Sequence, residues 1–196
     1  MIREKHKVLI ADDHTVIRRG IALILNTQFK VQGVFECGEA GKIIQSIEEN
    51  KITHAILDVT FPDQSSIFYL DQILTQFPEL KILLFTMHPK ALFQNTFSKY
   101  KQILYCQKNE SEQQFTRMLK KLFSNEISPN NIPKRKEKSK DFSAMEEKVL
   151  LLLLGGASTK EISEKLNIKS NTVSTYKRRI FDKKEVQNLM ELSKLY

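Results

Sequence analysis

Apolar residues in the first two-thirds of the chain follow two alternating patterns. One is a short, nearly continuous apolar run, which is typical of a strand covered on both faces. Such runs occupy residues 8–11, 31–35, 55–57, 82–85 and 103–106. The segments between them place apolar residues three and four positions apart, as amphipathic helices do. Five strands alternating with five helices predict an α/β unit in which a doubly wound parallel sheet carries helices on both faces.

Beyond this region the pattern changes twice. Residues 128–141 contain two prolines, two asparagines and a charge run around one apolar residue, so they predict a linker. Residues 142–196 show helical spacing only. The chain therefore divides into an α/β domain over residues 1–127, the linker, and a small all-α domain.

Four helices are expected in the all-α domain. Two of them begin with a serine followed three positions later by a glutamate, the capping box in which each side chain bonds the other's backbone N–H. These pairs are Ser143 with Glu146 and Ser158 with Glu161. Gly155 and Gly156 end the first helix. The last two helices are expected near residues 171–183 and 187–195.

Composition indicates an ordinary globular protein, with 41% hydrophobic and 28% charged residues. No apolar run approaches the roughly 20 residues that span a membrane, and the charged N-terminus does not resemble a secretory signal. A cytoplasmic protein with no membrane partner is expected. Cys37 and Cys106 lie far apart without metal-ligand spacing, so both are expected to be reduced core thiols.

The net charge of +8 is unevenly distributed. Residues 1–127 hold 16 Lys and Arg against 14 Asp and Glu, whereas residues 128–196 hold 15 against 9. A small basic unit indicates a polyanionic partner, usually nucleic acid. A lysine-rich solvated surface would give the same composition, so the charge alone leaves both interpretations open.

Polar residues gather at the expected ends of the strands. Asp12 and Asp13 follow the first strand, Asp58 the third, Thr86 the fourth and Lys108 the fifth. The carboxyl ends of parallel strands meet at one edge of the sheet, where crowded carboxylates need a cation, and oxygen ligands favour Mg²⁺. Mg²⁺ and a lysine would neutralise a phosphoryl group, and an Asp can be its nucleophile. Each residue taken singly also fits an ordinary turn or cap.

These residues, in this order and spacing, resemble the receiver domain of two-component systems, a flavodoxin-like fold. The resemblance assigns each of them a role. It implies Mg²⁺ ligands at Asp12, Asp13, Asp58 and the Thr60 carbonyl, the phosphoacceptor at Asp58, and switch or phosphate-binding residues at Thr86, Tyr105 and Lys108. It implies that a sensor histidine kinase phosphorylates Asp58, after which Thr86 moves to the phosphoryl oxygens and Tyr105 turns inward.

The chain departs from the receiver pattern in two places. Ser66 stands where the family usually has glycine, eight residues after the acceptor, and is expected to alter that loop modestly. Tyr100, Lys101 and Gln102 replace a small-residue stretch before the fifth strand. This region borders the surface that usually changes on activation, so partner contacts and the dimer interface are left open.

Residues 142–196 resemble the LuxR-type helix-turn-helix module of the NarL/FixJ family. The matching phrase is Gly-Ala-Ser-Thr-Lys-Glu-Ile-Ser-Glu-Lys-Leu over residues 156–166. The helix near residues 171–183 is expected to enter the major groove of double-stranded DNA. Ser174, Thr175 and Arg178 match the family's base-reading positions, and Lys177 and Arg179 would hold phosphates.

Two departures occur around this helix. Lys184 and Glu185 replace the usual Leu-Gly, which is expected to loosen the turn into the last helix. Lys169 replaces a serine cap, and Ser170 is expected to take over the cap. The lysines of residues 134–140 either tether the two domains or add phosphate contacts.

A phosphorylation-controlled DNA-binding regulator, dimeric when active and not an enzyme, is the function that these patterns favour. One alternative keeps DNA binding and uses the receiver as a constitutive dimerisation module. The other is a phosphatase with Asp58 as nucleophile. Haloacid-dehalogenase-like phosphatases usually carry a second Asp two positions later, where this chain has Thr60.

Overall fold

The computed structural model describes residues 6–62, 65–88, 100, 102–124 and 142–195. Their first part forms a five-stranded sheet in which every neighbouring pair of strands is parallel. The strand order β2-β1-β3-β4-β5 is that of a doubly wound sheet. The strands are β1 (Lys7–Ala11), β2 (Gly33–Cys37), β3 (His54–Leu57), β4 (Lys81–Thr86) and β5 (Ile103–Gln107).

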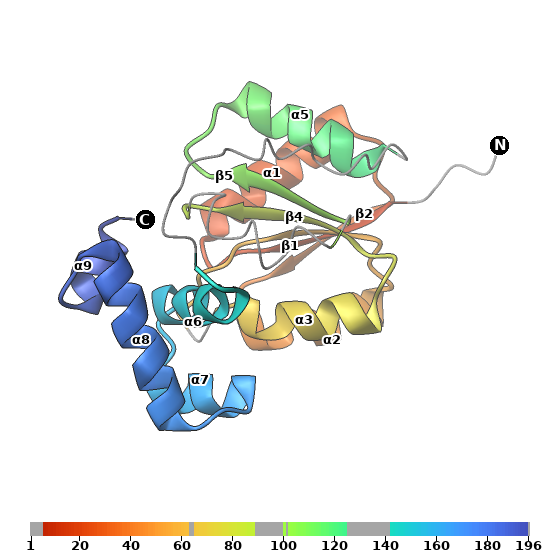
Figure 1. Ribbon diagram of the computed structural model, residues 1–196. Coiled ribbons are helices and arrows are strands. Elements are labelled where there is room, and N and C mark those ends of the chain that lie inside the picture. The colour runs from red at the N-terminus through yellow and green to blue at the C-terminus, as the bar shows by residue number, and fades with distance from the viewer. Residues whose placement is uncertain (1–5, 63–64, 89–99, 101, 125–141, 196) are drawn as a thin grey trace.

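Helices cover both faces of this sheet, as the continuous apolar strands predicted. Helices α1 (Thr15–Gln28) and α5 (Glu112–Phe123) lie on one face, and α2 (Ile43–Asn50) and α3 (Ile67–Gln76) on the other (Figure 1). Side chains alternate along each strand, so Val8 and Ile10 join the core beneath α1 and α5, whereas Leu9 joins the core beneath α2 and α3.

The C-terminal part forms four helices whose buried apolar side chains belong to the same core cluster as those beneath α2 and α3. These are α6 (Ala144–Leu154), α7 (Thr159–Leu166), α8 (Ser170–Lys184) and α9 (Leu189–Ser193). Both predicted capping boxes are present, with Ser143 and Ser158 each bonding the N–H of the glutamate three positions later. Gly155 ends α6 as predicted. The fold class read from the sequence is therefore confirmed.

Three local predictions were wrong. Strand β2 starts two residues later than its apolar run, because pairing with β1 begins at Gly33 opposite Lys7. Helix α9 starts at Leu189 because the Asn188 side chain caps it. Ser170 lies inside α8; the cap position is Lys169, and it makes no side-chain cap bond.

Two predicted elements lie outside the described residues. The helix expected between the fourth and fifth strands would fall on residues 89–99, and the linker prediction falls within residues 125–141. Within the described ranges, no helix is long and apolar enough to cross a bilayer. Both cysteines are buried and free, as predicted.

Candidate functional site

Asp58 follows the end of the central strand β3 and is 5% exposed. Its Oδ1 accepts the N–H of Val59 at 2.6 Å, and its Oδ2 accepts the Lys108 ammonium at 2.7 Å. The same ammonium lies 2.6 Å from Asp12 Oδ2. The loop after β5 thus places one cation between two buried carboxylates that come from different strands.

Burial and charge act against each other in this cluster. Burial raises the pKa of Asp58, and the Lys108 ammonium beside it only partly opposes that effect. For Lys108, burial favours the neutral amine, but the two carboxylates outweigh it and raise its pKa. Lys108 is therefore charged at neutral pH and is the main counter-charge that the described residues offer to Asp58.

The acidic pair after β1 is held by its neighbours. Asp12 donates its N–H to the Cys37 carbonyl and accepts the His14 N–H on Oδ1. The Arg18 guanidinium donates to the backbone carbonyls of Asp12 and Asp13, at 2.7 and 3.2 Å, and to Glu36 at 3.0 Å. Because Arg18 binds the carbonyls of the pair, both carboxylates are left for the site.

The donor set fits a hard cation. Asp12, Asp13 and His14 bring ligand atoms within 4.8 Å of one another. Asp12 Oδ2 contacts the Lys108 ammonium at 2.6 Å, and Asp13 Oδ1 lies 2.8 Å from His14 Nδ1. Buried carboxylates are costly unless they are paired with cations. Oxygen ligands beside room for water suit Mg²⁺.

The predicted switch residues lie beside this cluster. Thr86 is fully buried at the end of β4, and its hydroxyl accepts the His88 N–H at 3.4 Å. Tyr105 is half-buried and its hydroxyl donates to the His88 carbonyl. Burial raises the pKa of Tyr105, so it stays a neutral donor. The exposed Thr60 hydroxyl lies 3.2 Å from the His88 imidazole.

Ser66 fits its unusual position without strain. Its φ of −62° and ψ of −18° are open to any residue, so this loop does not need glycine. The hydroxyl donates to the Asp58 carbonyl at 2.5 Å. The departure therefore adds a bond between the start of α3 and the backbone of Asp58.

Helix α8 presents the predicted polar face. Val173 and Ile180 are fully buried, whereas Ser174, Arg178 and Arg179 are exposed. The Lys177 ammonium lies 5.5 Å from the Phe181 ring centre. Arg178 and Arg179 leave the helix at an accessible surface, where a duplex could meet them.

The turn after α8 shows how Lys184 and Glu185 are accommodated. Glu185 adopts a left-handed conformation, with φ of 57°, in the place where glycine is usual. Lys184 lies over the Phe142 ring at 5.2 Å, so its stem and charge pack against an aromatic surface.

The structure thus brings Asp12, Asp13, Asp58 and Lys108 into one cluster, with Thr60, Thr86 and Tyr105 at its border. Sequence reasoning missed Arg18, His14 and His88. Arg18 and His14 lie close after the acidic pair in the chain, which is the only signal that marked them. His88 had none, because its contact with Thr60 joins residues 28 positions apart.

A doubly wound domain with a buried Asp–Lys–Asp cluster at its strand ends, followed by a basic helix-turn-helix, defines a two-domain signalling regulator. Residues 8–120 match the response regulator receiver domain and residues 140–195 match the bacterial regulatory proteins of the luxR family. The receiver match covers more than half of the chain, and the chain belongs to the response regulators. It is a DNA-binding transcriptional regulator with a receiver domain rather than an enzyme.

Similar proteins share this two-domain layout. The oxygen regulatory protein NreC of Staphylococcus haemolyticus is 28% identical, over 95% of this chain and 94% of its own length. A structure of an RcsB–DNA complex is 26% identical with a TM-score of 0.73, covering 97% of this chain and 98% of that one. RcsB from Salmonella enterica serovar Typhimurium, bound to the rprA promoter with BeF₃⁻, shares the fold at 24% identity, a TM-score of 0.75 and the same coverage.

Proposed function

We propose that Asp58 accepts a phosphoryl group from a sensor histidine kinase and that this controls DNA binding by helix α8. On this proposal the chain divides into a phosphoacceptor unit over residues 1–127, a linker over residues 128–141 and a DNA-binding unit over residues 142–196. The observation that carries the proposal is the buried cluster in which Lys108 lies within 2.7 Å of both Asp58 and Asp12.

The chemistry follows from that cluster. An Asp58 oxygen attacks phosphorus, the bond from phosphorus to the donor histidine nitrogen breaks, and that nitrogen keeps the electron pair and takes a proton. Lys108 would bond the transferred oxygens. Asp12, Asp13, Asp58 and the Thr60 carbonyl would hold Mg²⁺, which neutralises phosphoryl charge when bound. Thr86 and Tyr105 would then change partners.

Incubation with acetyl phosphate and Mg²⁺ tests the acceptor. Wild-type protein should gain one phosphoryl group in its intact mass, and Asp58→Asn should gain none. Omission of Mg²⁺ should slow the reaction strongly. Equal labelling of Asp58→Asn would show that another residue is the acceptor.

The DNA-reading residues are tested by gel shifts on a selected and a random duplex at fixed salt. Ser174, Thr175 and Arg178 would read bases, and Lys177 and Arg179 would hold phosphates. Arg178→Ala should lose about 1–3 kcal/mol of discrimination between the duplexes. Lys177→Ala should weaken binding to both and reduce the salt slope by about one. Lys42→Ala in the sheet domain is the control, and an Arg178→Ala variant that behaves like it contradicts the assignment.

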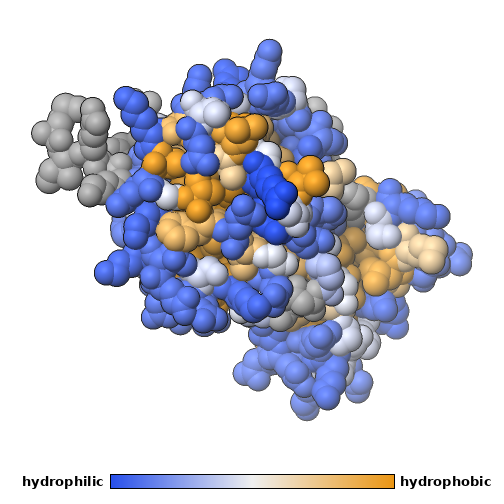
Figure 2. Space-filling model, turned by 180° about the vertical axis from the view of Figure 1, so that it is seen from behind, coloured by the Kyte–Doolittle hydropathy of each residue, from blue (hydrophilic) through white to orange (hydrophobic). Residues whose placement is uncertain are grey.

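An active homodimer is part of the proposal. A structure of RcsB is described as two dimers bound to two parallel DNAs. In this chain Val16 and Leu23 on α1 and Met190 on α9 are more than half exposed, and Figure 2 shows apolar surface on both domains. Light scattering should show the mass double with phosphodonor. DNA affinity that phosphodonor leaves unchanged would favour the constitutive dimerisation alternative. The cytoplasmic location stays a prediction.

A further inference from the structure

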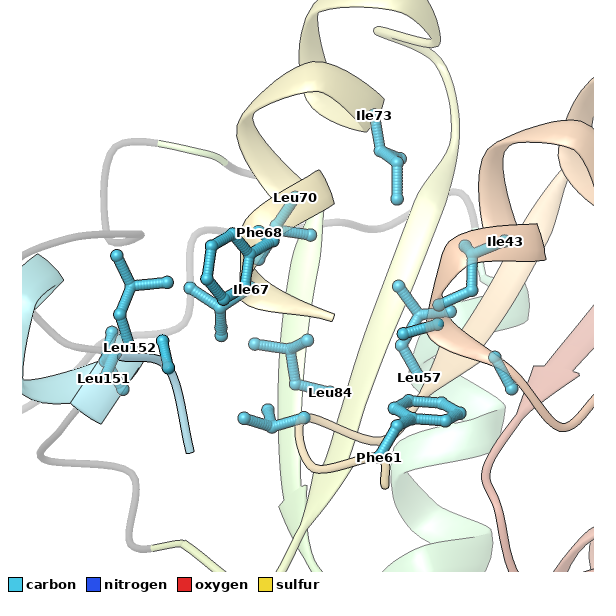
Figure 3. Packing of buried hydrophobic residues seen from close by; sticks show 14 of the residues in the cluster. Ile43, Leu57, Phe61, Ile67, Phe68, Leu70, Ile73, Leu84, Leu151 and Leu152 are labelled. Carbon is cyan, nitrogen blue, oxygen red and sulfur yellow. The ribbon is translucent and has the colours of Figure 1, made fainter. Parts of the chain in front are cut away.

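The two domains share one apolar seam. The buried cluster beneath α2 and α3 continues into the small domain without interruption. Leu151 and Leu152 of α6 lie opposite Ile67 and Phe68 of α3 (Figure 3). All four side chains are at most 8% exposed. Surface of this kind stabilises contact in proportion to the area removed from water, so the seam is a packed interface.

The seam contains one backbone approach that only glycine permits. A Cβ built on Gly155 would lie 2.4 Å from the Ser65 Cβ and 2.7 Å from its Oγ. The backbone of Gly155, with φ of −77°, is open to any residue. The neighbouring Ser65, rather than the turn, therefore requires glycine at this position.

Ser65 connects this contact to the phosphoacceptor. It is fully buried, and its hydroxyl donates to the Val59 carbonyl at 2.9 Å. Val59 in turn donates its N–H to Asp58 Oδ1. Three residues thus lead from the Asp58 carboxylate to the end of α6.

Charged groups complete the edge of the seam. Lys148 of α6 donates to Asp71 of α3 at 2.9 Å. The Lys165 ammonium of α7 lies 5.7 and 5.6 Å from the ring centres of Phe68 and Tyr69, within the range of cation–π attraction. The small domain therefore matches the start of α3 in both polarity and charge.

Docking at this seam leaves the recognition helix free. The contacts above come from α6, its C-terminal turn and α7, and α6 lies between α3 and α8 (Figure 1). Ser174, Arg178 and Arg179 of α8 are exposed in the docked chain.

We infer that the Asp58 loop and α3 form a docking surface for helices α6 and α7 of the same chain. DNA can bind α8 without disrupting this docked arrangement. The receiver then acts on the position of the DNA-binding domain and does not mask its recognition helix. Phosphorylation, which rests on the proposed function of Asp58, reaches the seam because it changes the oxygens that hold Val59 and Lys108.

Zero-length carbodiimide cross-linking of the full chain tests this inference. The reagent joins a carboxylate to an amine already in contact, and Asp71 and Lys148 are accessible, at 51% and 33% exposed. Peptide mass spectrometry should find the Asp71–Lys148 link. The Glu39–Lys42 pair, 2.6 Å apart and entirely within the sheet domain, serves as the internal control. A missing Asp71–Lys148 link beside a normal control link would overturn the docking.

Adding a saturating DNA duplex distinguishes an accessible recognition helix α8 from a masked one. The normalised Asp71–Lys148 yield should stay constant if α8 is free, whereas its loss on DNA binding would overturn the inference. Gly155→Ala should lower the yield about fivefold or more, since the added methyl overpacks the seam, and Ser65→Gly in the same chain should restore it. Gly20→Ala, which meets open space, is the matched control.

DNA affinity of Gly155→Ala gives the second decision. If the seam masked α8, opening it in Gly155→Ala would raise DNA affinity about fivefold or more. A recognition helix that is already accessible predicts no gain. A gain of that size would therefore overturn the inference. Phosphodonor should lower the cross-link yield of wild type and leave Asp58→Asn unchanged. If the protein is fully phosphorylated but its cross-link yield does not change, the coupling between Asp58 and the seam is refuted. If the protein is not phosphorylated at all, only the proposed acceptor is refuted.

Discussion

Replacing Lys108 with methionine tests the charge cluster most directly. The ammonium is 8% exposed and lies 2.6 and 2.7 Å from the Asp12 and Asp58 carboxylates. Methionine keeps much of the side-chain length but leaves two buried carboxylates facing each other. Removing one partner of a buried ion pair costs about 3–5 kcal/mol. We expect the free energy of unfolding to fall by about 3 kcal/mol at pH 7 without Mg²⁺.

Urea titration followed by far-UV circular dichroism measures this change. With a slope of about 2 kcal/mol per molar urea, the midpoint should fall by about 1.5 M. Lys42→Met is the matched control, because its partner Glu39 and Lys42 itself are both largely exposed, and surface pairs contribute little. Its midpoint should not move measurably.

Acid and Mg²⁺ should both reduce the deficit of Lys108→Met. Burial already raises the pKa of Asp58 above its ordinary 3.8, and loss of the ammonium raises it further. A group with a raised folded pKa stabilises the protein at low pH and loses that effect as pH rises through the folded pKa, so the deficit should shrink as the pH is lowered from 7. Mg²⁺ at about 100 times its dissociation constant from the variant should add about 2.7 kcal/mol to the variant's free energy of unfolding. Equal midpoints for Lys108→Met and wild type at pH 7 would refute the reasoning.

Three further predictions follow from single residues. Glu185→Gly relieves a left-handed backbone and should raise the free energy of unfolding by about 0.5–1 kcal/mol, with Asn167→Gly gaining less; no rise in melting temperature would contradict this. Burial lowers the pKa of His54 to about 3, so stability should fall as pH drops below about 6.5, by up to about 1.4 kcal/mol per unit. His54→Phe should flatten that slope in urea titrations, and an unchanged slope would point to another group. Arg18→Ala should weaken Mg²⁺ binding about tenfold or more by calorimetry, whereas exposed Arg19→Ala should not; equal affinities would leave Arg18 without a positioning role.

Much of the site could be predicted because its residues follow strands. Asp12, Asp58, Thr86 and Lys108 come after apolar runs, and parallel strands end at one edge of the sheet. The helix-turn-helix could be read from its capping boxes, which are local signals within four residues. The limits of β2 and α9 could not, because strand pairing set the first and the Asn188 side chain set the second.

The sequence by itself determined the fold class, the two units and the residues that meet at the strand ends, because apolar period and local capping act over short distances along the chain. The tertiary structure alone decided that Arg18 holds the acidic loop, that His88 faces Thr60, and that Gly155 lies against Ser65. The last two contacts join residues 28 or more positions apart, and their partners are chosen by shape and charge after the elements have packed. For the same reason, the path from Asp58 to the DNA-binding domain is visible only in the folded chain.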